Sequence, residues 1–114
     1  MSDEFIQIAT QEINGEITNF ENILNSCNNN GDANQNASEF QKYTHKIKGL
    51  APMMGKENLG EMAALLDNIL KKTIDGQAIE GIFEILTESF PYMKKSMNEP
   101  DSDLSSIIEK LKTL

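Results

Sequence analysis

The sequence predicts an all-α protein: an antiparallel, up-down-up-down four-helix bundle with a short fifth helix at its C-terminal end. In four long segments, apolar residues recur three and four positions apart, which is the spacing of one helix face. No segment of useful length alternates apolar and polar residues as a half-buried strand does. The links between the segments are mostly short, which favours antiparallel neighbours. The 114 residues predict one domain, with the bundle over about 3–98 and the extra helix over about 102–113.

A first helix is predicted from about Asp3 to Cys27. Ser2 is placed to cap it, and the acidic residues of its first turn suit the positive end of the helix dipole. Its apolar stripe consists of Ile13, Ile17, Phe20, Leu24 and Cys27. The segment 28–36 is rich in Asn, Gly and Asp, which favour turns, and it predicts a loop.

A second helix is predicted from about Glu39 to Met54. Ser38 and Gln41 have the spacing of a capping box, and Gly55 is a typical residue to follow a helix. Its apolar cluster consists of Phe40, Tyr43, Ile47, Leu50, Ala51 and Met54. Pro52 removes the backbone hydrogen bond to the Lys48 carbonyl, so we expect the helix to bend after Lys48.

The remaining helices follow the same spacing. A third helix over about 57–73 has an apolar face of Leu59, Met62, Ala63, Leu66, Ile69 and Leu70. Asp75-Gly76 predicts a turn, and a fourth helix over about 77–97 carries Ile79, Ile82, Phe83, Leu86, Phe90, Met93 and Met97. Pro91 is expected to kink or interrupt it. After Pro100, Asp101 or Ser102 is placed to cap the fifth helix, which carries Leu104, Ile107, Ile108 and Leu111.

Composition narrows the possible functions. The formal net charge of -8 argues against binding to nucleic acid and to an anionic membrane surface. No apolar run reaches the length of about 18 residues that spans a bilayer, and the start of the chain lacks the apolar region of a secretory signal. Cys27 is the single cysteine, which favours a cytoplasmic location. With one histidine and one cysteine, we expect no metal site. We also expect no cofactor, and we expect a monomer because the bundle can bury its own apolar stripes.

The only histidine, His45, is the main candidate for chemistry. On the second helix it lies opposite the apolar cluster, with Lys48 about 60° to one side and Gly49 about 40° to the other, so it should face solvent. A neutral imidazole can attack phosphorus, and a nearby ammonium can offset charge on phosphoryl oxygens. Glycine leaves room for the phosphoryl group and for a partner, at a cost to helix stability of roughly 0.5–1 kcal/mol. The arrangement therefore predicts a phosphorylated histidine.

Further lysines lie close to His45 in the sequence. Together with Lys48 they form a small basic island in an acidic chain, which suits phosphate and a partner with an acidic active site. Met53 lies off the apolar stripe and is expected to be accessible to a partner. The residues predicted to contribute to docking are Lys42, Lys46, Met53 and Lys56.

The run His45-Lys46-Ile47-Lys48-Gly49-Leu50-Ala51, followed by Met54-Gly55, resembles the signature of histidine-containing phosphotransfer (HPt) domains. Over 43–75 the sequence is most similar to the amino-terminal phosphotransfer domain of CheA-type chemotaxis histidine kinases. The resemblance implies that His45 accepts a phosphoryl group, on Nε2, from an ATP-dependent kinase domain. It also implies transfer of that group to an aspartate of a response-regulator receiver domain.

The resemblance also implies an orienting carboxylate on the third helix. The matching residue is Asp67, one methylene shorter than the glutamate expected in CheA-type domains. A companion histidine sometimes present three residues earlier is replaced by Ala64, and Pro52 stands where the family usually has a small residue.

Two other functions compete with phosphotransfer. A docking module would keep the bundle and bind a receiver domain without carrying phosphate, but it gives no reason for His45. A hydrolase with His45 as general base lacks a nucleophile beside it, since the adjacent Thr44 points about 100° away on a helix. The chain also lacks a phosphate-cradling glycine loop and a nucleotide fingerprint. It is therefore predicted to be a phosphocarrier and not an enzyme, either alone or as one domain of a CheA-type kinase.

Overall fold

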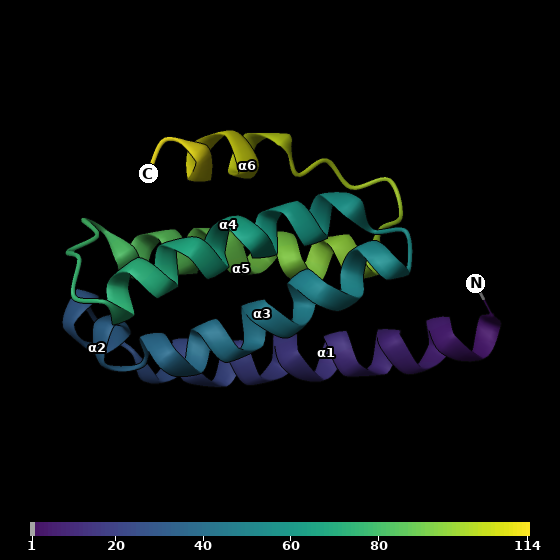
Figure 1. The fold of residues 1–114 in the computed structure, drawn as a ribbon, viewed down its shortest axis with the longest axis horizontal. Helices are drawn as coiled ribbons and strands as arrows, with labels where there is room; N and C mark the ends of the chain where they lie inside the picture. The colour runs from purple at the N-terminus through teal and green to yellow at the C-terminus, as the bar shows by residue number, and fades with distance from the viewer. Residues whose placement is uncertain (1) are drawn as a thin grey trace.

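Residues 2–114, which the computed structural model describes, fold into six helices without a strand (Figure 1). The all-α prediction is confirmed. The helices are α1 (Asp3–Ser26), α2 (Asn30–Gln35), α3 (Ala37–Met53), α4 (Glu57–Ile74), α5 (Ile82–Asn98) and α6 (Ser105–Lys112). The four long helices lie side by side along the molecule, and α6 lies on the outer side of α4 and α5.

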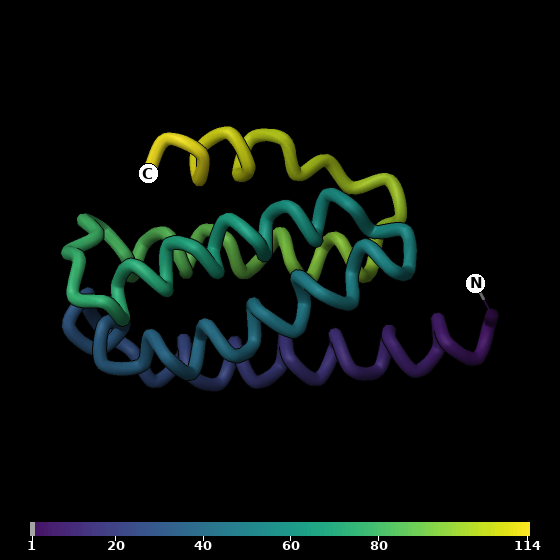
Figure 2. The backbone as a smooth tube through the Cα atoms, viewed as in Figure 1, coloured from purple at the N-terminus to yellow at the C-terminus, as the bar shows by residue number. Residues whose placement is uncertain are grey.

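The connections between helices gather at the two ends of the molecule. The α1–α3 connection, which contains α2, and the α4–α5 link lie at one end, and the α3–α4 and α5–α6 links lie at the other (Figure 2). Helix α3 packs most extensively on α4, and α1 packs on α3 and α5. The helix packing is consistent with a bundle.

The predicted apolar stripes form the core. All the stripe residues expected on the first, third and fifth helices are buried. The rings of Phe20 and Phe40 meet edge to face with centroids 4.9 Å apart, which joins α1 to α3. Ser2 caps α1 as predicted, because its Oγ accepts the N–H of Phe5 at 3.1 Å. Gly55 ends α3 as predicted, with a φ of 83° that glycine adopts without strain.

The prediction of a loop over 28–36 is wrong, because residues 30–35 form α2. The side chain of Asn29 accepts the N–H of Asp32 at 2.8 Å and caps this short helix. Ala33 is fully buried and anchors it to the core. The side chain of Asn30 accepts the N–H of Phe83 at 2.9 Å, at the start of α5. The asparagines that predicted a loop therefore cap two helices.

Three helix starts also differ from the prediction. Helix α3 begins at Ala37, so Ser38 is an exposed residue inside it and not its cap. Helix α5 begins at 82 and not at 77, because Gly81 adopts a left-handed conformation with φ of 73° just before it. At α6, the N–H of Ser105 is accepted by Asp103 at 2.9 Å, and neither Asp101 nor Ser102 acts as the cap.

Pro91 does not interrupt α5, contrary to one expectation. The helix is continuous from Ile82 to Asn98. Ser89 and Met93, on either side of the proline, are both fully buried, so packing against the core holds the helix through this position.

Helices α3 and α4 approach each other closely where Pro52 meets Gly60. A Cβ atom at Gly60 would lie 2.6 Å from Pro52 Cγ and 2.8 Å from Pro52 Cδ, both in a rigid ring. The missing side chain at Gly60 therefore makes room for Pro52. This contact lies one turn beyond Lys48 on α3 and contributes to the placement of α3 on α4.

Replacing Gly60 by alanine should destabilise the fold, because the new methyl group cannot fit without moving α3 or Pro52. We expect Gly60→Ala to lower the free energy of unfolding by about 1–3 kcal/mol in urea denaturation. The matched control is Gly15→Ala in α1, where a Cβ meets no atom within 4 Å. It should raise the free energy of unfolding by roughly 0.5–1 kcal/mol. Adding Pro52→Ala to Gly60→Ala should restore part of the lost free energy of unfolding. Equal effects of Gly60→Ala and Gly15→Ala would contradict the close approach of the two helices.

Candidate functional site

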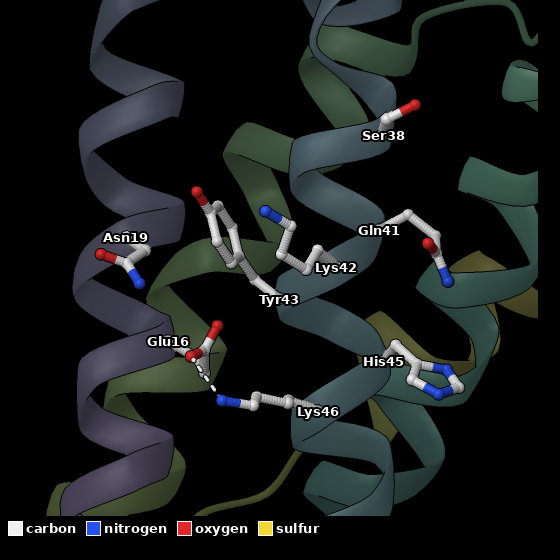
Figure 3. Close-up of a pocket in the computed structure, with 8 residues that line it drawn as sticks. All are labelled: Glu16, Asn19, Ser38, Gln41, Lys42, Tyr43, His45 and Lys46. Carbon is white, nitrogen blue, oxygen red and sulfur yellow. Dashed lines mark ion pairs between the residues drawn. The ribbon is translucent and has the colours of Figure 1, made fainter.

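His45 lies on the exposed side of α3, as predicted. Its side chain is 58% exposed, while Ile47 on the opposite side of the helix is fully buried. In Figure 3, His45 and Gln41 project from the side of α3 that faces α4. Lys42, Tyr43 and Lys46 project from the side that faces α1. The imidazole is therefore fixed to a packed helix and accessible to a large partner.

Asp67 on α4 is fully buried and is the centre of the site. On one side of its carboxylate, Gln41 donates an amide hydrogen to Oδ1 at 2.7 Å. His45 Nδ1 lies 3.7 Å from the same oxygen. On the other side, Oδ2 lies 3.0 Å from Lys48 Nζ and 3.2 Å from Lys71 Nζ. Asp67 does not belong to the apolar face predicted for this helix, yet it is as completely buried as that face.

The surroundings of Asp67 keep its carboxyl group ionised. Burial by itself raises the pKa, because it disfavours the charged form. Hydrogen bonds from Lys48, Gln41 and Lys71 outweigh burial and hold the pKa of Asp67 below its ordinary value of 3.8. Asp67 is therefore an acceptor without a proton of its own to give to the imidazole.

The distance between His45 Nδ1 and Asp67 Oδ1, 3.7 Å, is longer than a hydrogen bond. The short aspartate side chain contributes to this gap, since a glutamate reaches one methylene further. Nδ1 nevertheless faces the carboxylate, which leaves Nε2, across the ring, as the nitrogen available to a reacting partner.

Gly49 leaves open space beside His45. A Cβ atom at this position would meet no atom within 4 Å, so the glycine is not required by packing. It is exposed in the middle of α3, where glycine costs stability. The space it leaves is on the surface that a phosphoryl group or a partner would approach.

The residues predicted to dock a partner divide between two places. Lys42 and Lys46 line a groove between α1 and α3, and His45 also borders it, although its ring points away from α1 (Figure 3). Lys46 Nζ lies 3.6 Å from Glu16 Oε1, and Lys42 Nζ lies 3.7 Å from Glu39 Oε2. Both ammonium groups are therefore already paired with a carboxylate.

Lys56 and Met53 lie near the other end of α3. Lys56 Nζ donates to the carbonyl of Ser96 at 2.9 Å, in the last turn of α5, where a cation satisfies a free carbonyl. Lys56 lines a cleft that His45 does not line. Met53 is 53% exposed at the end of α3, as predicted.

Sequence reasoning missed two residues of the site, Gln41 and Lys71. Gln41 was assigned to a capping box, although it lies four residues before His45 and so on the same face of the helix. Lys71 lies four residues after Asp67, a spacing that places an ammonium beside a carboxylate on one helix.

Comparison with known proteins finds no relative of the chain. No protein-family model, no curated protein and no solved structure matches the chain. Within residues 2–114, none of the helices has both the length and the apolar character that crossing a bilayer requires. Function is therefore inferred from the chemistry of the site.

Replacing Asp67 by asparagine tests the buried charge. The pKa of Asp67 in the folded chain lies below its ordinary value of 3.8. The ionised carboxylate therefore stabilises the fold above pH 3.8, and this stabilisation is lost as the pH falls through the folded-state pKa. We expect Asp67→Asn to lower the free energy of unfolding at neutral pH by about 1–3 kcal/mol. The difference from the unsubstituted chain should shrink at acidic pH.

The measurement is urea denaturation at neutral pH and below pH 3.8, the ordinary value for an aspartate. The control is Asp101→Asn, which changes an exposed carboxylate in the α5–α6 link and should have little effect at either pH. A loss of stability in Asp67→Asn that is the same at both pH values would show that the charge of Asp67 is not its stabilising feature.

Proposed function

We propose that this chain is a histidine phosphotransfer domain of a two-component or chemotaxis phosphorelay. In this proposal His45 accepts a phosphoryl group from an ATP-dependent histidine kinase domain and passes it to an aspartate of a response-regulator receiver domain. The observation that carries the proposal is an exposed imidazole whose Nδ1 faces a buried, ion-paired carboxylate, 3.7 Å from its nearer oxygen.

The chemistry of the proposed step uses the two ring nitrogens differently. With the proton on Nδ1, directed at Asp67, the lone pair on Nε2 forms the bond to the γ-phosphorus of ATP. The bond from that phosphorus to the bridging oxygen breaks, and its electron pair leaves with ADP. The ring becomes an imidazolium, which the Asp67 carboxylate stabilises through Nδ1–H. Transfer onward reverses this: a receiver carboxylate oxygen attacks phosphorus, and the N–P electron pair returns to Nε2.

The arrangement of helices supports the same function. We propose that α1, α3, α4 and α5 form an antiparallel up-down-up-down bundle with α6 added on the outside, and that the chain acts as a monomer in the cytoplasm. A reacting group on a packed helix is held more precisely than one on a loop. Gly49 leaves the ring accessible to two successive macromolecular partners.

In this proposal the chain is a substrate and not a catalyst. The kinase partner binds ATP, and the receiver supplies the acceptor aspartate, so the chain itself requires no cofactor. Lys48 and Asp67 would act on the phosphoryl charge and on the imidazole, and Lys42 and Lys46 would contact the partners in the groove beside His45.

The first test is phosphorylation of the chain and of His45→Gln. ATP with a CheA-type kinase catalytic core is one donor, and phosphoramidate, which needs no docking surface, is the other. Intact mass should show one added phosphoryl group that is labile in acid and stable in base. His45→Gln should remain folded by circular dichroism and acquire no label.

The absence of an acid-labile label from both donors, in a folded chain, would refute phosphotransfer. The receiver-docking module would then be the better explanation of the bundle. A label that persists in His45→Gln would place the modification on another residue and equally refute the proposed role of His45.

Gly49→Leu tests the open space beside His45. The fold should tolerate leucine, since a Cβ at this position meets nothing within 4 Å. Phosphorylation by phosphoramidate should be nearly unchanged, because this donor is small. Phosphorylation by the kinase core should slow at least about tenfold, because the larger side chain displaces the partner from the ring. An equal loss with both donors would indicate damage to His45 itself and contradict a steric role for Gly49.

A further inference from the structure

Two ammonium groups share a single carboxylate oxygen at the site. Lys48 on α3 and Lys71 on α4 both pair with Asp67 Oδ2, at 3.0 and 3.2 Å. One cation is enough to neutralise one carboxylate. With a neutral imidazole, the cluster therefore has one positive charge in excess, in a chain whose net charge is -8. The second cation requires an explanation beyond the neutralisation of Asp67.

The two lysines are held differently. The Lys48 side chain is 34% exposed and joins α3 to α4. Lys71 is 51% exposed, and its pair with Asp67 lies within one helix. Lys71 pairs with Asp67 through a half-exposed side chain, and Asp67 keeps Lys48 and Gln41 when Lys71 leaves, so the release of Lys71 has a small cost. Lys48 is less exposed, lies closer to Oδ2 and joins two helices, which makes it the more permanent partner.

Phosphorylation of His45 would change which negative groups are available to pair with these two cations. A phosphoryl group brings about 1.5 to 2 negative charges to the Nε2 side of the ring. At the same time the new imidazolium requires Asp67 as the acceptor for Nδ1–H. Asp67 then has three cationic neighbours, while the phosphoryl oxygens have none of their own.

We propose that Lys71 is a mobile counterion and a positioning residue for the transfer reaction. It pairs with Asp67 while His45 is unmodified and moves to the phosphoryl oxygens when His45 is phosphorylated. Asp67 keeps Lys48 and Gln41 and gains the Nδ1–H bond, which closes the gap of 3.7 Å. This inference rests on the function proposed above, and it assigns to Lys71 part of the charge stabilisation that was predicted from the sequence for Lys48 alone.

The test is the equilibrium constant for phosphorylation of the chain by ATP, with ADP present and a trace of kinase core as catalyst. This constant does not depend on how the kinase docks, so it reports the stability of the phosphorylated chain relative to the unphosphorylated one. Lys71→Met should lower it roughly threefold, because the pair that is lost with the phosphoryl group is stronger than the pair that is lost with Asp67, which keeps Lys48. Lys71→Arg should restore it, because arginine keeps the charge and can also bind phosphoryl oxygens.

The matched control is Lys72→Met, which removes the same charge from the next residue of α4. Lys72 is exposed and lies about 100° around the helix from Lys71, so the constant should stay close to that of the unsubstituted chain. A second measurement uses the unphosphorylated chain. In Lys71→Met, Asp67 is a stronger acceptor, so ¹⁵N NMR at alkaline pH should show a larger fraction of the imidazole with its proton on Nδ1. The signal is unambiguous because His45 is the only histidine.

The outcomes separate this inference from the function on which it rests. If the unsubstituted chain takes up no phosphoryl group, the proposed function fails and the inference fails with it. If that chain is phosphorylated but Lys71→Met has the same equilibrium constant, only the inference is overturned. It is also overturned if Lys71→Arg fails to restore the constant, or if Lys72→Met lowers it as much as Lys71→Met does.

Discussion

The carboxylate of Asp67 is fully buried between two helices, and a buried charge must be compensated by neighbours held in fixed positions. Its donors come from both sides of the contact: Gln41 and Lys48 from α3, and Lys71 from α4. Sliding or rotating α3 relative to α4 would separate the carboxylate from Gln41 and Lys48. The position of α3 on α4 at the level of His45 is therefore set by the same charge that faces the imidazole.

This coupling explains how an exposed side chain can still be well oriented. His45 has solvent on one side, but the helix beneath it is tied to α4 by the Asp67 contacts and, one turn further on, by the close approach of Pro52 to Gly60. Pro52 lies inside the last turn of α3, and a glycine on the facing helix accommodates its ring. The contacts that stabilise the packing of α3 on α4 are therefore the contacts that also orient His45.

The sequence was sufficient to predict the long helices. It was not sufficient to predict helix ends and the short helix α2, which depend on single side chains. Helices α1 and α4 were predicted within one residue at either end, because long apolar stripes fix both their existence and their buried face. The errors at α2 and at the start of α5 arise from Asn29, Asn30 and Gly81, whose effect depends on local hydrogen bonds and backbone conformation.

The site shows the same division. Spacing on one helix places Lys48 and Gly49 beside His45, and only resemblance pointed to Asp67. The convergence of Gln41 and Lys48 on that carboxylate depends on the relative rotation of α3 and α4. Helical periodicity gives the pair of Asp67 with Lys71 but not that rotation, so the burial of the charge between the two helices was visible only in three dimensions.

The distribution of lysines bears on what a phosphocarrier requires. Lys42, Lys46, Lys48 and Lys71 each pair with a carboxylate, so a phosphoryl group on His45 would gain a cation only by replacing an existing ion pair. The net stabilisation of the phosphorylated state is then the difference between two ion pairs, and it is smaller than the attraction of a free cation would be. A carrier benefits from this limit, because a group held too tightly on His45 would not pass to the next acceptor. The acidic partners of these lysines are therefore part of the proposed chemistry, because they reduce the positive charge that surrounds a phosphoryl group on His45.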